Sequence, residues 1–232
     1  MEAEKRLEKE TMILDAAERV FAARGYAATT VKDVAQEAGV ATGTVYLYFP
    51  SKEELFLALI DRGTRAVLEG IVRARQGKPD VIAKLAASLE GAVRAFSAHR
   101  DLARVALLQA PGALAACEER LAQLHRLFAD YVAQDLEEAR AAGLIPPLDA
   151  RVAAWAWVGS FAEILLAWVR GDVADLEEVL PGLVAYNLRG IGAPGLRESQ
   201  RGQAARSAGP AERRSAGRDQ PPAPGGFAAG ER

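Results

Sequence analysis

Apolar residues recur three and four positions apart along most of this chain, and no stretch alternates with the period of two expected of a half-buried strand. Part of this pattern reads Leu114, Cys117, Leu121, Leu124, Phe128 and Val132. A chain of 232 residues with this spacing is long enough to bury a sizeable helical core. We therefore predict an all-α fold of about nine helices.

Capping residues and glycine or proline breaks divide the chain into these helices. The predicted ranges are 7–24, 31–38, 42–48, 52–75, 80–99, 101–110, 114–142, 150–170 and 175–189. Pro181 falls within the first two turns of the last range. A proline there removes a backbone hydrogen bond, so we expect a kink or a late start of that helix.

Residues 30 to 49 have the spacing of a helix-turn-helix, T-V-K-D-V-A-Q-E-A-G-V-A-T-G-T-V-Y-L-Y-F. Gly39 permits the left-handed turn between the two helices, and Val45 and Phe49 hold the second helix on its buried face. The residues predicted to face outward are Thr42, Gly43, Thr44, Leu47 and Tyr48. They are small or polar near the helix start, as a close approach to DNA base edges requires.

Charge alone does not indicate nucleic-acid binding. Residues 1 to 60 contain seven Lys and Arg against ten Asp and Glu, so their net charge is 7 − 10 = −3. A DNA-binding domain usually carries a basic patch, and this one does not. The prediction of DNA binding therefore rests on geometry and on hydroxyls, backbone N–H groups and helix N-termini, which also bind phosphate.

The segment Val152 to Val169 is nearly all apolar and about as long as a short membrane span. Glu163 and Ser160 interrupt it, and no basic flank anchors it, so we favour a buried helix over a span and expect no membrane partner. The single cysteine, Cys117, cannot form an internal disulfide. Together with the lack of a secretory signal, this predicts a cytoplasmic protein.

The run from Ile13 to Leu55 resembles the N-terminal domain of the TetR family almost position by position. Its portion A-G-V-x-x-G-T-x-Y-x-x-F-x-x-K-E-x-L is a highly specific signature of that family. The resemblance implies an all-helical transcription regulator, most simply a repressor that binds double-stranded operator DNA as a homodimer. It implies a DNA-binding domain over 1–50 and an effector-binding and dimerisation domain over 51–191. A ligand-responsive activator of the same fold is the alternative.

The family's DNA contacts carry over residue by residue. Thr42, Gly43 and Thr44 occupy base-facing positions; Tyr46, Tyr48 and Lys52 occupy positions that contact phosphate. The complete predicted DNA-binding set is Thr30, Lys32, Thr42, Gly43, Thr44, Tyr46, Leu47, Tyr48 and Lys52. Ala41 departs from the pattern, because a serine often caps the recognition helix at this position. Alanine cannot cap, so Thr42 is expected to take that role and to be less free to reach a base.

Two further surfaces are predicted in the larger domain. Pairing of the helices at 152–170 and 175–189 with their copies would bury the excess apolar surface, with an interface of Trp157, Ile164, Leu165, Trp168, Leu183 and Tyr186. An apolar interior suits an apolar effector, although a filled core is the alternative for each lining residue. The predicted lining is Phe96, Leu107, Leu108, Leu121, Leu124, Phe128, Trp155, Val158 and Phe161.

The stretch from Gly143 to Asp172 is also similar to the C-terminal part of TetR-type repressors of fatty-acid degradation, which long-chain acyl-coenzyme A releases from DNA. This resemblance implies acyl-CoA as the effector; a drug-like or aromatic effector is the alternative. Arg94, Arg100 and Arg104 would then meet coenzyme A phosphates, unless they are simply solvated surface arginines.

No pattern predicts an enzyme, a metal site or a cofactor. His99 and Asp101 are close in sequence but do not form a catalytic pair, and His125 stands alone on a helix. No His, Cys and acidic residues have metal-ligand spacing. From Gly192 onward Gly, Pro, Ser, Ala and Arg dominate, so residues 192–232 are predicted to be a disordered tail.

Overall fold

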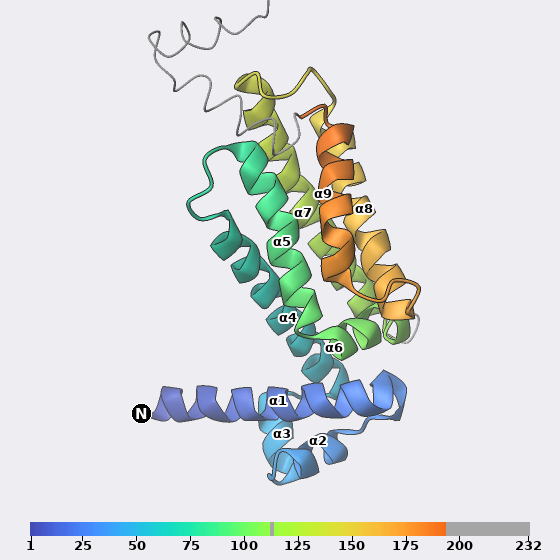
Figure 1. Cartoon of the computed structure of the whole chain (residues 1–232). Helices are drawn as coiled ribbons and strands as arrows, with labels where there is room; N and C mark the ends of the chain where they lie inside the picture. Colours follow the sequence, from blue (N-terminus) through green and yellow to red (C-terminus); the bar gives the residue numbers. More distant parts are fainter. Residues whose placement is uncertain (112–113, 194–232) are drawn as a thin grey trace, which may run out of the picture. The chain divides into compact units, whose positions relative to one another are not determined.

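A computed structural model describes residues 1–111 and 114–193 (Figure 1). The all-α prediction is confirmed: these residues contain nine α-helices and a π-helical segment, with no strand among them. The elements are α1 (Glu2–Ala28), α2 (Val31–Glu37), α3 (Thr42–Tyr48), α4 (Lys52–Arg75), α5 (Val81–Ser97), α6 (Arg100–Arg104), η1 (Val105–Gln109), α7 (Ala115–Ala141), α8 (Ala150–Arg170) and α9 (Leu176–Gly190).

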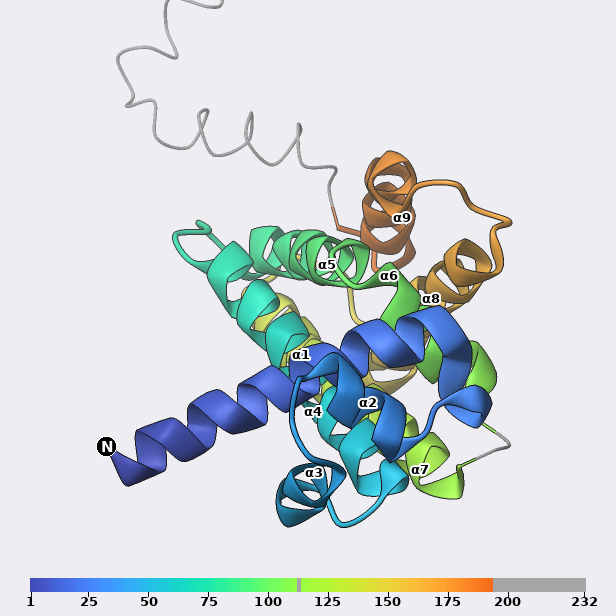
Figure 2. The same cartoon turned by 90° about the horizontal axis from the view of Figure 1, so that it is seen from below.

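The helices form an upright body and a smaller base. Helices α4, α5, α7, α8 and α9 run roughly side by side, and α1 crosses beneath them with α2 and α3 on its far side (Figures 1 and 2). The most extensive helix pairs are α4 with α5 and α7 with α8. Since α4 follows directly after α3, it carries the chain from the base into the body.

Side-chain caps fix most helix starts where the sequence placed them. Thr30, Ser51, Asp80, Asp149 and Asp175 each accept a hydrogen bond from a backbone N–H in the first turn of the following helix. At the N-terminus the prediction was too short, because α1 begins at Glu2 rather than at residue 7. Glu2 and Glu4 lie in that first turn, where their negative charge interacts favourably with the positive end of the helix dipole.

Two helices differ from their predicted form. The range 101–110 is α-helical only to Arg104, after which Ala110 N donates to Val105 O at 2.9 Å, the five-residue step of a π-helix. The last helix begins at Leu176 and continues through Pro181, so a late start is wrong. Pro181 removes one backbone hydrogen bond from this helix, because it has no N–H to donate.

The base has a hydrophobic core that extends into the body. Phe21, Tyr26 and Phe56 pack together, with edge-to-face ring contacts of 5.0 Å between Phe56 and each of the other two. The same cluster includes Val45 from α3 and Val105 from η1. A second cluster fills the space between α5, α7, α8 and α9. The apolar groups of α1 to α3 are therefore buried against the first turns of α4 and against η1.

Helices α4 and α5 touch at a pair of glycines. A Cβ on Gly91 would lie 2.7 Å from Gly70 O and 2.8 Å from the Cα of Ile71, which are backbone atoms and cannot rotate away. Gly63, also on α4, would meet nothing within 4 Å. The glycine pair therefore sets how closely the two helices approach.

We expect Gly91→Ala to lower the free energy of unfolding by about 1–3 kcal/mol, because the added methyl group forces the two backbones apart. Gly63→Ala is the matched control and should be neutral or stabilising by up to about 1 kcal/mol, since alanine is the better helix former. Denaturant titrations of both variants give the difference. A Gly91→Ala variant as stable as the wild type would contradict the close crossing.

Helix α8 is long and apolar enough, by length and composition, to cross a membrane. In the fold it packs against α7 and α9. Gly192 and Ala193, placed in the predicted tail, still close the end of α9, where Ala193 N donates to Leu188 O at 2.9 Å. The rest of the predicted tail, residues 194–232, lies outside the described residues.

Candidate nucleic-acid interface and effector cavity

Of the residues predicted to face outward from α3, Gly43 and Leu47 are exposed, whereas Thr42, Thr44 and Tyr48 are half-buried. Val45 and Phe49 are buried beneath it, as the sequence pattern requires. Leu47 is 81% exposed and Tyr46 is 49% exposed. Gly43 is exposed as well, and a Cβ there would meet nothing within 4 Å. The outer surface of α3 is thus an uncharged face of small, hydroxyl and aromatic groups.

The start of α3 has no side-chain cap. Ala41 is the N-cap residue, and no side chain accepts from the first-turn N–H groups. The expectation that Thr42 takes over the cap is wrong, because Thr42 is already the first helical residue. A residue inside the helix does not have the extended backbone from which a cap side chain reaches the next turn. Thr44 N donates to Ala41 O at 2.9 Å, which leaves the N–H groups of Thr42 and Gly43 for an anion or for water.

Thr30 and Asp33 form a complete capping box at the start of α2. Asp33 N donates to Thr30 Oγ1 at 3.2 Å, and Thr30 N donates to Asp33 Oδ2 at 2.9 Å. The Thr30 hydroxyl also donates to Asp33 Oδ2 at 2.7 Å, and these bonds hold the pKa of Asp33 below its usual range. Lys32 is exposed beside this box, with no ion pair to any described residue.

Lys52 is engaged within the protein. Its Nζ donates to Tyr26 O at 3.0 Å and to Ala27 O at 3.4 Å, and it lies 4.6 Å from the centre of the Tyr26 ring. The ammonium therefore ties the start of α4 to the end of α1. Tyr48 is half-buried against the core of the base, while Tyr46 is not part of that core. Sequence reasoning did not find this internal role of Lys52.

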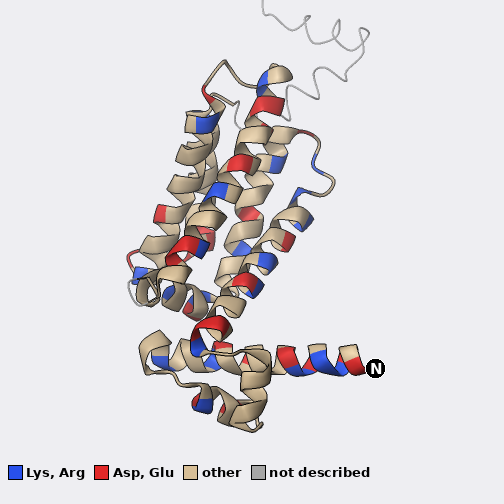
Figure 3. Cartoon of the chain, turned by 180° about the vertical axis from the view of Figure 1, so that it is seen from behind, with Lys and Arg blue, Asp and Glu red and all other residues tan. Residues whose placement is uncertain are grey.

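Acidic and basic residues do not separate into a basic face. Figure 3 shows both signs alternating along the N-terminal part of α1 and scattered over the upright helices. In the base, Arg19 pairs with Glu37 at 2.7 Å and Arg24 with Asp33 at 2.7 Å. These pairs use two of the base's few cations, so the electrostatic attraction to DNA from this surface is small.

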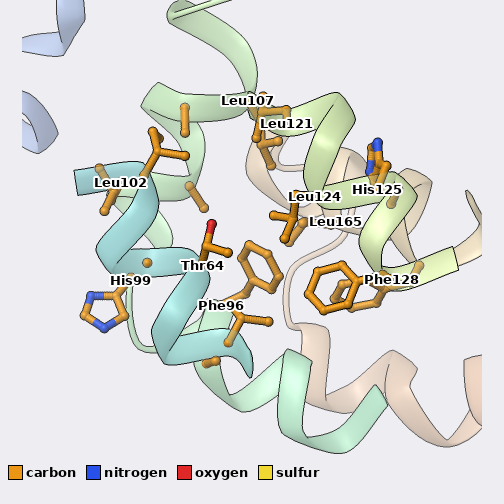
Figure 4. Close-up of a pocket in the computed structure, with 18 of the residues that line it drawn as sticks. Thr64, Phe96, His99, Leu102, Leu107, Leu121, Leu124, His125, Phe128 and Leu165 are labelled. Carbon is orange, nitrogen blue, oxygen red and sulfur yellow. The ribbon is translucent and has the colours of Figure 1, made fainter. Parts of the chain in front are cut away.

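An apolar cavity of about 150 Å³ lies between α4, α5, α6, η1, α7 and α8. Phe96 and Phe161 meet inside it with ring centres 5.8 Å apart. Figure 4 shows four side chains that converge in the cavity: Phe96, Phe128, Leu124 and Leu165. The Thr64 side chain points toward them from α4. The polar side chains among its lining are Thr64, His99 and His125. Burial lowers the pKa of His125, which favours the neutral ring in this wall.

Most of the predicted lining residues meet at this cavity. Phe96, Leu107, Leu121, Leu124, Phe128, Val158 and Phe161 all line it. Leu108 and Trp155 do not, and both are exposed. Leu108 turns outward within the π-helical segment, and Trp155 lies on the outer face of α8. The wall supplied by α4, with Leu59, Gly63 and Val67, was missed altogether.

His99 stands between this cavity and the base. It lines the cavity, and its Nδ1 lies 2.6 Å from Glu18 Oε1 on α1. Arg62 of α4 pairs with the same Glu18 and donates to Asp15 Oδ1 at 2.6 Å. In Figure 4 the His99 ring is turned away from the phenylalanine rings. A polar network therefore joins one wall of the cavity to the helix beneath it.

The structure corrects most of the predicted dimer interface. Trp157, Leu165, Trp168 and Leu183 are each less than 9% exposed, because they pack into the core of their own chain. Leu165 lines the cavity instead. Of the remaining predicted interface residues, Ile164 is half-buried and Tyr186 is 68% exposed.

An exposed recess runs between α8 and α9. It is lined by Ser160, Glu163, Ile164, Glu178, Val179, Gly182, Leu183 and Tyr186. Trp155 and Val152 are also exposed further along α8. The recess itself combines apolar and small residues with the carboxylates of Glu163 and Glu178.

Comparison with known proteins links these features to transcription regulation. Residues 13–59 match the sequence profile of the bacterial regulatory proteins of the tetR family. The fatty acid metabolism regulator protein of Bacillus subtilis is 28% identical over 165 residues, which are 71% of this chain and 85% of that protein.

Solved structures agree in fold over nearly their whole length. The transcriptional regulator FadR from Bacillus subtilis, in complex with stearoyl-CoA, superposes with a TM-score of 0.70 at 27% identity, covering 78% of this chain and 98% of that one. The fatty acid degradation regulator FadR from Bacillus halodurans gives 0.68 at 27% identity, covering 77% and 97%.

Proposed function

We propose that this chain, which belongs to the TetR family of bacterial regulatory proteins, is a cytoplasmic repressor that binds a palindromic operator as a dimer and is released by an effector with a long apolar chain. The observation that carries the proposal is that one chain has both an exposed, uncharged α3 face and an apolar cavity enclosed by the helices of the upright body. The polar network around His99 lies between the two.

In this proposal α3 enters the major groove. Thr42, Gly43, Thr44 and Leu47 reach base edges, which the lack of side-chain bulk at Gly43 permits. Thr30, Lys32, Tyr46 and Tyr48 lie at the phosphates, with the uncapped N–H groups of α3 as further donors. Lys52 contributes a positive charge at the start of α4 while it remains bonded to the carbonyls of α1.

The salt dependence of operator binding should be modest, because few cations face the DNA. We expect fewer than about six phosphates to be neutralised per dimer, with each contributing about 0.9 to the slope of log affinity against log salt concentration. Fluorescence anisotropy over a range of salt concentrations measures this slope. A slope near ten would require a basic surface that α1 to α3 do not offer.

The dimer is proposed to form through the exposed face of α8 and α9. Val152 and Trp155 of α8 and Tyr186 of α9 are large apolar or aromatic side chains that remain exposed within one chain, so they are available to a partner. Tyr186 and the small residue Gly182 lie on this face. A two-fold pair of these helices would place two α3 helices on one duplex, as recognition of an inverted repeat demands.

Tyr186→Asp should weaken the dimer at least tenfold, because it places a charge where an aromatic ring would be buried. Tyr131→Asp is the matched control, since Tyr131 is an exposed tyrosine on α7 that does not line the α8–α9 recess. Light scattering at micromolar concentration separates dimer from monomer. If the wild-type protein is a stable monomer, the proposed dimer is wrong. If Tyr186→Asp dimerises as strongly as the wild type, the interface does not include Tyr186.

The effector is proposed to be an acyl-CoA, which has a long apolar chain for an apolar cavity. The similarity to a regulator solved with stearoyl-CoA supports this choice. At about 150 Å³ the cavity matches one that holds benzene. A long acyl chain would therefore displace the walls. An effector that fits only a rearranged protein binds one state more tightly than the other, and this is the condition for releasing DNA.

The test uses an inverted repeat from the DNA around the protein's own gene. The labelled duplex is bound by the full chain, and acyl-CoAs from butyryl to stearoyl are titrated into the complex. We expect release by the longer chains at lower concentration than by the shorter ones. If no acyl-CoA releases the DNA, the effector class is rejected. If the protein binds no such repeat at all, operator binding is rejected with it.

A further inference from the structure

The segment that includes α3 and its two flanks contains none of the side chains that read a base pair through two hydrogen bonds. Between Ala38 and Pro50 there is no Arg, Lys, Asn, Gln, Asp or Glu. Arg and Lys are the usual readers of guanine, Asn and Gln of adenine, and Asp and Glu of cytosine. The polar side chains that remain are the hydroxyls of Thr42, Thr44, Tyr46 and Tyr48. A hydroxyl both donates and accepts, so it distinguishes the bases poorly.

Leu47 is a large apolar side chain on the outward face of this segment. It is 81% exposed, whereas Val45, two residues before it, is fully buried. Gly43 lies one helical turn before Leu47 on the same face and is also exposed. A Cβ on Gly43 would meet nothing within 4 Å. The outward face of α3 therefore has a bare stretch of backbone with an apolar side chain next to it.

A single exposed leucine is common on protein surfaces, and its surroundings decide what it can do here. Leu7 of α1 is 64% exposed, but it stands between the charged residues Arg6 and Glu8. Leu47 has the two tyrosines as its neighbours in sequence and no charged residue within the segment. When α3 lies in a groove of DNA, no charged neighbour has to be desolvated together with Leu47.

The apolar group that the major groove offers to such a side chain is the thymine methyl. Thymine is the one base that presents a C5-methyl group there, and apolar side chains contact it. Burying Leu47 against that methyl removes two apolar surfaces from water. Adenine or guanine at the same position would place hydrogen-bonding groups against a side chain that cannot pair with them, and cytosine lacks the methyl. Leu47 can thus favour one base without a hydrogen bond.

We propose that Leu47 is a specificity-determining residue, which contacts the C5-methyl group of a thymine at one fixed position in each half of the operator. This inference rests on the proposed function, because it places α3 in the major groove. It goes beyond that function by naming the base and the chemical group that are recognised. The operator accordingly has a thymine at this position in both half-sites.

The test removes the methyl group from the DNA and the leucine side chain from the protein, separately and together. The DNA is the inverted repeat from around the protein's own gene, bound by the full chain. Each thymine is replaced in turn, in both half-sites, by deoxyuridine, which lacks only the C5-methyl. Operator Kd is measured by fluorescence anisotropy for the wild type, for Leu47→Ala and for Leu7→Ala as the matched control. Thermal unfolding of each variant confirms that the fold is retained.

We expect one thymine position at which deoxyuridine weakens wild-type binding about fourfold per half-site, or roughly 15-fold for both, as the burial of one methyl group predicts. Leu47→Ala should bind the thymine operator more weakly than the wild type does. It should lose less than about twofold more when the methyl is removed, as a double-mutant cycle requires of a direct contact. Leu7→Ala should behave as the wild type.

A second measurement adds the methyl group instead of removing it. At the sensitive position, 5-methylcytosine should be bound about fourfold more tightly per half-site than cytosine, because the two differ only in the C5-methyl. The proposal is overturned if no thymine is sensitive in the wild type, if Leu47→Ala keeps the full methyl effect, or if 5-methylcytosine and cytosine are bound equally. A wild-type protein that binds no inverted repeat would instead overturn operator binding, which keeps the two failures distinct.

Discussion

Arg75→Ala is expected to lower the free energy of unfolding by about 3–5 kcal/mol, because it leaves the buried Asp135 carboxylate without its counter-charge. Arg75 Nη1 lies 2.5 Å from Asp135 Oδ2 and Nη2 lies 2.7 Å from Oδ1, so the pair is bidentate. Ser88 accepts a third bond from the same guanidinium at 3.0 Å. These bonds raise the pKa of Arg75 above its ordinary value. The pair ties the end of α4 to α7.

Arg140→Ala provides the matched control. Arg140 pairs with Glu137 three residues away, and both side chains are about half exposed. An exposed pair of this kind contributes at most about 1 kcal/mol. Arg75→Lys should lower the free energy of unfolding by an amount between those of Arg75→Ala and Arg140→Ala, since it keeps the charge but loses the planar fork. Urea unfolding of the three variants measures how much each lowers the free energy of unfolding. If Arg75→Ala lowers it no more than Arg140→Ala does, the buried-pair argument is contradicted.

His99→Ala is expected to uncouple the effector from DNA. The variant should bind operator with near-normal affinity, yet saturating stearoyl-CoA should no longer release the DNA. The reason is the position of His99, which lines the cavity and contacts Glu18 on α1 2.6 Å away. A typical coupling between two sites is about 1–3 kcal/mol, or 5- to 150-fold in affinity. Loss of the contact should remove most of that factor.

The measurement is the ratio of operator Kd with saturating stearoyl-CoA to operator Kd without it. His125→Ala is the matched control, because His125 also lines the cavity and has no hydrogen bond or ion pair to α1. Glu18→Gln should reproduce the His99→Ala result, since it weakens the other end of the same contact. If His99→Ala responds to effector as fully as His125→Ala does, the coupling runs through other residues.

The helix starts were predictable from the sequence because capping depends on a few neighbouring residues. Thr30, Ser51 and Asp80 each bond to an N–H within the next three positions, and no distant group has to be known. The π-helical segment at 105–109 was not predictable in this way. It depends on how η1 packs between α1 and α8, and the local sequence reads as an ordinary helix.

Spacing identified which face of a helix is buried but not which neighbour covers it. Phe96 and Phe128 were placed in the cavity correctly, whereas the α4 wall was missed because Leu59 and Val67 have the spacing of any packed helix. The interface prediction failed for a related reason. Trp157 and Trp168 were assigned to an excess of apolar surface on their helix, but large side chains gain the most from burial within their own chain.

The shared core of the base has a consequence for recombination between relatives. Exchanging residues 1–50 for those of another regulator would leave Phe56 against foreign partners in place of Phe21 and Tyr26. Leu55 and Leu59 would be mismatched in the same way. A graft that keeps this packing has to include α4 at least to Ile60 and to match the η1 residues it meets. The segment that must be exchanged to transfer DNA specificity is therefore longer than the helix-turn-helix itself.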